Sequence, residues 1–317
     1  MKNVANVFVG VDVSKLFLDI CLYPKNLFFK VKNNDDGIEK FFDTLSSYEI
    51  ERVAFESSGG YENLLLDHCQ QAGYAVWQID PKLVKAFIIS EGVKAKTDKI
   101  DAKMIALFAS KKEPKHEKMA IAENQKKLRA LVQRRDALVA MSSMEKKRLN
   151  GPMATYCKAD IEEMLKIFAD SINAFEVKIQ QIIAEDSKMR QRKEILESIP
   201  GIGSTTAASL IAHMPELGDI TNKQAAALIG VAPYSKQSGM YQGNEMISGG
   251  RFAPRCALYM AALSACRYNP VMKHFYGRLR CAGKKPKIAV VAVMNKLICT
   301  INAMCTKNTK WVYLPIS

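Results

Sequence analysis

Acidic residues are missing from the last part of the chain: none follows Glu245, whereas twelve lysines and arginines do. Over all 317 residues, 46 basic and 32 acidic side chains give a net charge of +14. A folded segment with this imbalance indicates a polyanionic partner, such as nucleic acid. A generally basic soluble surface and an anionic membrane are the alternatives. The membrane is less favoured, because the basic residues are spread among Gly, Pro and apolar runs and do not line one amphipathic helix.

Disulfide, zinc-binding and targeting patterns are also missing. The eight cysteines form no CxxC pair and the four histidines are scattered, which favours reduced thiols in a cytosol over a disulfide framework or a structural zinc site. The N-terminus shows no signal-peptide pattern. The most apolar run, 288–304, is interrupted by Asn295 and Lys296. We therefore expect a buried helix there, no membrane contact and a cytoplasmic protein.

What is present divides the chain into three segments. Residues 1–115 carry 16 basic and 16 acidic side chains, residues 116–190 carry 14 and 11, and residues 191–317 carry 16 and 5. The first segment has the order three strands, helix, strand, helix, strand, helices, which predicts an α/β domain with a mixed sheet. The expected strands are 7–13, 16–23, 27–31, 52–56 and 74–79, and the expected helices are 35–45, one from 61, 81–89 and one that Thr97 caps.

Four acidic residues occupy special places in this first segment. Asp12 and Glu56 end apolar strands, where open α/β sheets place their sites. Asp98 and Asp101 are three residues apart at a helix start, so their side chains share one helix face. Four carboxylates from three separate places suit a two-metal phosphoryl-transfer site for Mg²⁺ or Mn²⁺. Taken singly, each acid has an ordinary alternative, as a strand-end loop residue or as a helix-start acid neutralised by neighbouring lysines.

The second segment, 116–190, is rich in helix formers. An expected helix over 125–149 is broken by Gly151-Pro152. Beyond it, apolar residues recur in alternating four-three spacing, which predicts a helical hairpin or an intermolecular coiled coil that serves spacing and oligomerisation. The residues of this seam are Ile161, Leu165, Phe168, Ile172, Phe175, Ile179 and Ile182.

The third segment, 191–317, begins with a candidate phosphate-binding motif. Ile199-Pro200-Gly201-Ile202-Gly203 separates two expected helices, as in a helix-hairpin-helix motif. Gly201 and Gly203 would let backbone N–H groups approach a phosphate at a helix N-terminus. The rest of the segment is mostly helical by pattern. Its candidate nucleic-acid-binding side chains are Arg251, Arg255, Arg278, Arg280, Lys284, Lys285 and Lys287.

A polar, glycine-punctuated loop over 230–243 contains a further candidate. Ser238 precedes Gly239 there, and a serine in such a loop is either an exposed nucleophile or a turn residue. No histidine lies nearby in sequence to act as its base. Ser235 and Ser248 are rival candidates that the residues alone do not exclude.

Taken together, these motifs resemble a known family. In this order along nearly the whole chain they resemble the DEDD transposases, or recombinases, of the bacterial insertion-sequence 110/1111 family, whose relatives include pilin-gene invertases. The stretches that carry the resemblance are Val9–Lys15, Phe55–Tyr61, Lys96–Ala102, Ile199–Gly203, Gln237–Gly239 and Arg255–Met260.

The resemblance implies an RNase-H-like, RuvC-type domain at 1–115, a coiled-coil insertion at 116–190 and a C-terminal transposase domain at 191–317. It implies that Asp12, Glu56, Asp98 and Asp101 bind Mg²⁺, and that Ser238 attacks DNA to form a phosphoserine link at the acidic site of another protomer. It further implies a dimer or tetramer and a structured noncoding guide RNA that pairs with donor and target DNA in the bacterial nucleoid. The alternatives are an invertase without RNA, a metal-dependent nuclease or junction resolvase that uses activated water, and a non-catalytic nucleic-acid-binding protein.

Overall fold

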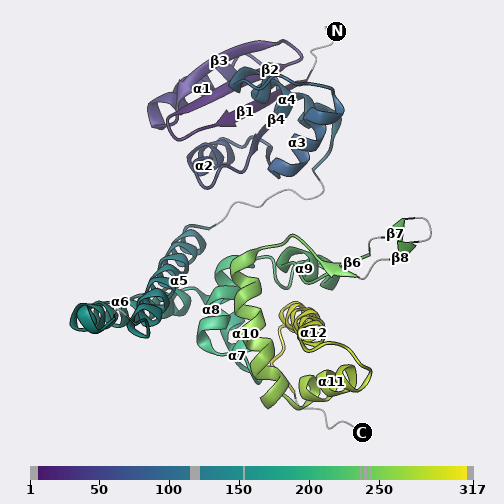
Figure 1. Ribbon diagram of the computed structural model, residues 1–317. Helices are drawn as coiled ribbons and strands as arrows, with labels where there is room; N and C mark the ends of the chain where they lie inside the picture. The colour runs from purple at the N-terminus through teal and green to yellow at the C-terminus, as the bar shows by residue number, and fades with distance from the viewer. Residues whose placement is uncertain are drawn as a thin grey trace. The chain divides into compact units, whose positions relative to one another are not determined.

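The computed structural model describes residues 6–114, 122–152, 154–235, 237–238, 241–242 and 245–312. The chain forms two compact units, Met1–Ala120 and Ile121–Ser317. Both are drawn in Figure 1, the first in purple to blue and the second in teal to yellow.

The first unit is built on one five-stranded sheet with the strand order β3-β2-β1-β4-β5. β1 and β2 pair antiparallel, as do β2 and β3, whereas β4 runs parallel to both β1 and β5. The sheet is therefore mixed, as the sequence predicted, and this arrangement is compatible with an RNase-H-like domain. The strands are β1 (Val7–Val13), β2 (Phe17–Tyr23), β3 (Leu27–Lys32), β4 (Ile50–Glu56) and β5 (Val76–Ile79).

Helices cover both faces of this sheet because its central strands are apolar on both sides. Val9 and Val11 join one buried cluster with α1 and α2, whereas Phe8 packs against a second cluster that holds α3 and α4 residues. Neighbouring residues of β1 thus point to opposite faces, as strand geometry requires. The helices are α1 (Asp35–Leu45), α2 (Asn63–Gln71), α3 (Pro81–Ser90) and α4 (Asp98–Lys111).

The α4 helix lies unusually close to the sheet, and Gly10 is the reason. A Cβ atom added at Gly10 would stand 2.2 Å from the carbonyl oxygen of Ala102 and 2.3 Å from the amide nitrogen of Ala106. Both atoms belong to the α4 backbone, so only glycine permits this approach. The start of α4 is fixed separately by Thr97, whose side chain accepts a hydrogen bond from the backbone N–H of Ile100 (3.3 Å). Together these residues set where the α4 carboxylates lie relative to β1.

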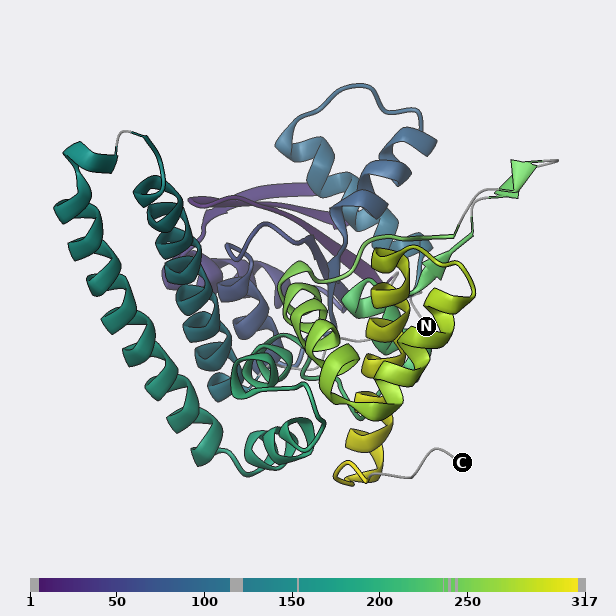
Figure 2. The same ribbon diagram turned by 60° about the horizontal axis from the view of Figure 1, so that its bottom comes forward.

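The second unit begins with a helical hairpin and continues as a helical bundle (Figure 2). Helices α5 and α6 pack against each other, and Leu128, Val132, Ile179 and Ile183 join the buried core that α7 to α12 share. The helical hairpin predicted for 116–190 is therefore observed. It belongs to the same compact unit as the C-terminal helices. The helices are α5 (Glu123–Leu149), the 3₁₀ turn η1 (Ala154–Tyr156), α6 (Lys158–Glu185), α7 (Ser187–Glu197), α8 (Ser204–His213), α9 (Asn222–Ile229), α10 (Phe252–Tyr268), α11 (Pro270–Cys281) and α12 (Pro286–Lys307).

The α12 helix contains the most apolar run of the sequence. In the described part of the chain it alone has the length and composition of a membrane-spanning helix. Its residues Val293, Leu297, Ile298 and Ile301 are fully buried in the core of the second unit. A soluble core helix passes the same test of length and composition, so this feature is weak evidence for a membrane span.

A β-ribbon connects α9 to α10. At its base β6 (Pro233–Tyr234) pairs antiparallel with β9 (Met246–Ile247), and further along β7 (Gln237–Ser238) pairs antiparallel with β8 (Tyr241–Gln242). Figures 1 and 2 both draw β7 and β8 beyond β6 and β9, on the side away from the helices of this unit. The loop predicted from its glycines is therefore a two-stranded ribbon.

Candidate functional site

The acidic residues that the sequence singled out gather at one end of the sheet in the first unit. Asp12 is the penultimate residue of β1 and Glu56 is the last residue of β4. The two strands are parallel neighbours, and Val11 pairs with Phe55, so the two acids follow at adjacent positions. Asp12 lies on the α4-facing side, because it is two residues beyond Gly10 on the same strand.

Burial and repulsion together shift the pKa of Asp12. Burial has the largest effect, followed by the negative charges of Asp101, Asp98 and Asp19, and together they raise this pKa from 3.8 to about 6. A carboxylate is destabilised when it leaves water and when it meets like charges. Asp12 therefore lies in the combined field of the two α4 acids and of a third acid on β2.

Two more members of the group show the same mutual influence. The pKa of Glu56 is raised by burial first and then by the charges of Asp12 and Asp101, while Lys96 lowers it. Burial also raises the pKa of Asp101, with Lys96 opposing the shift and Asp98 adding to it. Residues from two strands and one helix thus form a single electrostatic cluster, in which Lys96 supplies part of the counter-charge.

The donor atoms of this cluster fit Mg²⁺ or Mn²⁺, since hard divalent cations prefer carboxylate oxygens. Among the residues that the structure describes, no three acidic, histidine or cysteine side chains are close enough together to hold a metal ion. The backbone brings the four acids to one end of the sheet, and their side chains are spread there.

Two side chains of this cluster were not expected from the sequence. Asp19 on β2 pairs in register with Asp12 on β1 and with Lys30 on β3, so the three share one face of the sheet. The Nζ atom of Lys30 lies 2.9 Å from Oδ2 of Asp19 and 3.9 Å from Oδ2 of Asp98. The sequence signal for Asp19 was an acidic residue within the apolar pattern of β2. Its pairing with Lys30 could not be predicted without knowing the register of β2 and β3.

Glu62 organises the loop that follows Glu56, a role that no sequence pattern indicated. One carboxylate oxygen of Glu62 accepts hydrogen bonds from the N–H of Ser58 (3.1 Å), the hydroxyl of Ser58 (2.8 Å) and the N–H of Gly60 (2.8 Å). The other accepts one from Nε2 of Gln78 on β5 (2.6 Å). Glu62 is only 4% exposed, and these bonds lower its pKa despite its burial. A buried anion thus fixes the loop beside the acidic cluster.

In the second unit, two of the candidate DNA-binding arginines have partners within the protein. The guanidinium of Arg251 donates to both carboxylate oxygens of Glu216 (2.6 and 2.8 Å) and to the backbone carbonyl of His213 (2.6 Å). Arg255 donates to the carbonyl of Gly249 (2.6 Å) at the base of the ribbon. These contacts give both arginines a structural role, and their binding to nucleic acid stays a prediction.

The other candidate basic residues are grouped at one corner. They lie at the end of α11, in the turn that follows and at the start of α12, and all of them are exposed. Arg278 stacks on the ring of Phe275, with its Cζ atom 5.4 Å from the ring centroid. The basic corner comprises Arg278, Arg280, Lys284, Lys285 and Lys287.

The two glycines of the predicted hairpin motif differ in their surroundings. Gly201 has a φ of +104°, and a Cβ atom there would stand 2.7 Å from the backbone nitrogen of Ala265 in α10. Its contact is therefore with another helix. Gly203 precedes the first residue of α8 as its N-cap and is exposed, with no atom within 4 Å of an added Cβ. Of the two, Gly203 has the free space that a phosphate contact requires.

The backbone of Ser238 lies in β7, on the ribbon between α9 and α10. Its side chain lies outside the described part of the structure. Of its two rivals, Ser235 is exposed and its hydroxyl is 3.5 Å from Oε1 of Glu245, while Ser248 is exposed just after β9. The choice of nucleophile among the three stays a prediction.

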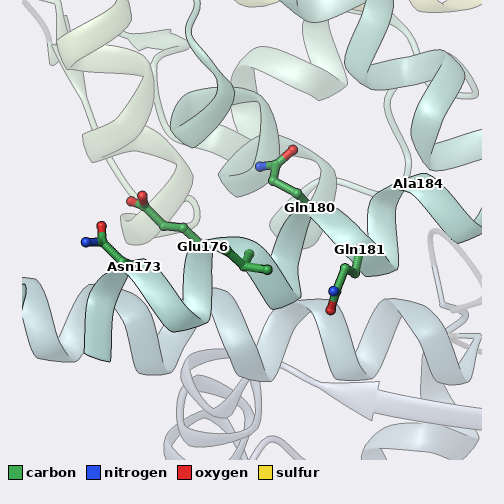
Figure 3. A pocket seen from close by; sticks show the side chains of 6 residues that line it. Asn173, Glu176, Gln180, Gln181 and Ala184 are labelled. Carbon is green, nitrogen blue, oxygen red and sulfur yellow. The ribbon is translucent and has the colours of Figure 1, made fainter. Parts of the chain in front are cut away.

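A surface hollow along α6 lies apart in sequence from all these residues. Figure 3 shows that its labelled side chains come from one helix. Its single acid, Glu176, is paired with Arg135 of α5 at 2.8 Å. We assign no catalytic role to this hollow, which is lined by Asn173, Glu176, Val177, Gln180, Gln181 and Ala184.

Comparison with known proteins places the chain in a family. A family model of DEDD type, described as "Transposase", matches residues 9–158, and one described as "Transposase IS116/IS110/IS902 family" matches residues 193–277. The pilin gene-inverting proteins of Moraxella bovis and Moraxella lacunata are each 26% identical over 315 residues, covering 96% of this chain and 97% of theirs. An uncharacterized 43.6 kDa protein of insertion element IS110 from Streptomyces coelicolor is 30% identical over 120 residues, covering 36% of this chain and 29% of its own. The chain belongs to the IS110 family of transposases and DNA-inverting proteins.

Proposed function

We propose that this protein is a divalent-metal-dependent DNA recombinase that cuts and rejoins strands. The observation that carries the proposal is the convergence of Asp12, Glu56, Asp98 and Asp101, which come from two strand ends and one helix. Burial and the charges of neighbouring acids raise the pKa of Asp12, Glu56 and Asp101. These four side chains would hold Mg²⁺ or Mn²⁺. When bound, the cation stabilises negative charge that develops on a scissile phosphate.

The hydroxyl of Ser238 is the proposed nucleophile, acting at the acidic cluster of another protomer. Its oxygen would form an ester bond with the phosphorus as the bond between phosphorus and one DNA oxygen breaks, and the proton of the serine hydroxyl would pass, directly or through water, to that DNA oxygen. One phosphate ester replaces another, so the DNA can be rejoined by the reverse exchange. The position of Ser238 on a ribbon between α9 and α10 supports this role, because loops and their tips carry many functional residues.

DNA is the substrate expected of a transposase or inverting protein, and the exposed basic corner at 278–287 suits its phosphates. We also propose a structured noncoding guide RNA that pairs with donor and target DNA. Base pairing would then supply the sequence specificity that the protein does not encode. The α5–α6 hairpin would join protomers into a dimer or tetramer.

The test is strand exchange on a supercoiled plasmid that carries both element ends, with and without RNA transcribed from the flanking noncoding segment. Asp12→Asn should abolish both cutting and joining. Ser238→Ala should abolish both and also the covalent protein–DNA adduct seen on a denaturing gel. Ser235→Ala is the matched control and should leave the adduct intact. Full strand exchange by Ser238→Ala would refute the assignment of the nucleophile.

The rival functions predict different products in the same assay. A nuclease or junction resolvase that uses activated water would leave cut, unjoined DNA and would not depend on Ser238. A non-catalytic binding protein would retain DNA binding and show no product change when Asp98 and Asp101 are replaced by Asn. Inversion of the segment without added RNA would favour an invertase, as the pilin gene-inverting relatives are named.

A further inference from the structure

Among the described residues, Lys30 is the one lysine that forms an ion pair with a residue of the proposed metal site, Asp98. It also forms one with a neighbouring acid, Asp19. Its strand register places it opposite Asp19, and Asp19 is opposite Asp12. Residues that are opposite across neighbouring strands share a face of the sheet and interact directly. The cross-strand series Asp12, Asp19, Lys30 therefore ends in a cation on the face that α4 covers.

The two contacts of Lys30 are unequal. The 2.9 Å contact with Asp19 is a direct charge-assisted hydrogen bond, and Asp19 is 13% exposed. The 3.9 Å contact with Asp98 is a looser ion pair, and that carboxylate is 67% exposed. Asp19 thus holds the ammonium in place while its charge faces Asp98. A cation–π contact also holds the ammonium, whose nitrogen lies 5.1 Å from the centre of the Phe17 ring.

We infer that Lys30 is a built-in counterion of the acidic cluster, which neutralises Asp98 until a divalent cation binds there. This inference rests on the proposed function, since it requires the four acids to bind a metal. The ammonium and a divalent cation compete for the same carboxylate. Binding of the cation therefore requires Lys30 to release Asp98 while it keeps its shorter bond to Asp19.

Such a counterion lowers the metal affinity that the acids would otherwise have. A unit positive charge a few ångströms from a divalent cation, in a water-like dielectric, corresponds to roughly a tenfold change in affinity. The water-like dielectric applies because the side chains of Lys30 and Asp98 are 47% and 67% exposed. The same charge relieves repulsion within the cluster when no metal is bound, so it stabilises the metal-free protein.

The experiment measures Mn²⁺ binding to the full-length protein by calorimetry and by the paramagnetic resonance signal of free Mn²⁺, without DNA. Lys30→Met should bind Mn²⁺ on the order of tenfold more tightly than wild type, and Lys30→Arg should match wild type. Lys32→Met is the matched control, because Lys32 is on the same strand and face but is opposite Phe17. The rise in melting temperature on adding Mn²⁺ should be larger for Lys30→Met than for either Lys30→Arg or Lys32→Met.

A double variant separates two causes of this gain. In Lys30→Met alone, the carboxylate of Asp19 loses its lysine partner and could bind Mn²⁺ itself. The double variant Lys30→Met with Asp19→Asn removes that carboxylate. Asp19→Asn alone is the reference, because the charge of Asp19 also acts on Asp12. If release of Asp98 causes the gain, the double variant binds Mn²⁺ more tightly than Asp19→Asn by most of the same factor. Equal affinity of the double variant and Asp19→Asn would overturn the inference, because the gain would then come from Asp19.

The remaining outcomes distinguish this inference from the proposed function. Equal Mn²⁺ affinity in wild type and Lys30→Met, with binding lost in Asp12→Asn, would refute the counterion role alone. Absence of Mn²⁺ binding in wild type would refute the metal site, and the counterion role with it.

Discussion

Replacing Gly10 by alanine should separate α4 from the sheet and weaken the acidic cluster. The new Cβ atom would stand 2.2 Å from the oxygen of Ala102 and 2.3 Å from the nitrogen of Ala106, whereas ordinary contact begins at 3.4 Å. Both obstructing atoms are backbone, so no side-chain rotation relieves the clash. The helix must therefore retreat by about 1 Å, and overpacking of this kind costs about 1–3 kcal/mol.

The chain contains a spectroscopic probe for this movement. Trp77 on β5 packs against Phe108 of α4, with ring centroids 5.2 Å apart. In a Trp311→Phe background, Trp77 is the only tryptophan left, so its fluorescence reports on the first unit. Urea titration should show a lower midpoint for Gly10→Ala, by the equivalent of about 1–3 kcal/mol. Mn²⁺ binding should weaken in parallel, because Asp98 and Asp101 move with α4.

A matched control comes from Gly277 in α11. An added Cβ there meets nothing within 4 Å, and alanine favours a helix over glycine by about 1 kcal/mol. Because Gly277 lies in the second unit and Trp77 in the first, Gly277→Ala should leave the midpoint of the Trp77 fluorescence transition unchanged. An unchanged Trp77 midpoint and unchanged Mn²⁺ affinity in Gly10→Ala would show that the close approach of α4 does not position the acids.

Three further predictions concern the second unit. His213 is 6% exposed. Burial, followed by the charge of a nearby arginine, lowers its pKa to about 4. The unfolded chain therefore binds the extra proton between pH 6.5 and 4. The free energy of unfolding of the second unit, which does not contain the Asp12 cluster, should fall by about 3 kcal/mol as the pH drops through that range. His213→Leu should flatten this dependence in pH-resolved urea titrations. Arg251→Met should lower stability by about 2–3 kcal/mol, because Glu216 loses a bidentate partner that is half-buried, and Glu216→Gln in the Arg251→Met background should recover part of the loss. Lys285→Glu with Lys287→Glu should weaken DNA binding at low salt and reduce the slope of log affinity against log salt by about 2.

Each of these has a clear contrary result. A His213→Leu protein that keeps the wild-type loss of stability between pH 6.5 and 4 would place the titrating group elsewhere. Wild-type stability of Arg251→Met would show that the ion pair with Glu216 contributes nothing. An unchanged salt slope after the double charge reversal would exclude the basic corner from the DNA interface.

The helices and strands of the first unit were predictable because their signals are local. The apolar run of β1, the cap at Thr97 and the proline that opens α3 each lie within a few residues of the element they define. Asp12, Glu56, Asp98 and Asp101 could be chosen for the same reason, since strand ends and helix starts are visible in sequence. Residues 230–243, which contain most of the ribbon, were expected only as a loop, because two-residue strands leave almost no periodic pattern.

The sequence by itself determined the order of the elements, the acids at their ends and the excess of positive charge after Glu245. The tertiary structure alone decided which of these side chains meet. Only the strand register places Lys30 against Asp19. Only the packing of α8 against α10 brings Arg251, at the start of α10, to Glu216, which follows α8. The physical reason is that apolar spacing and capping are set by residues a few positions apart in the sequence. The partner of a charged group is instead set by distance in space, and the two partners are far apart in the sequence.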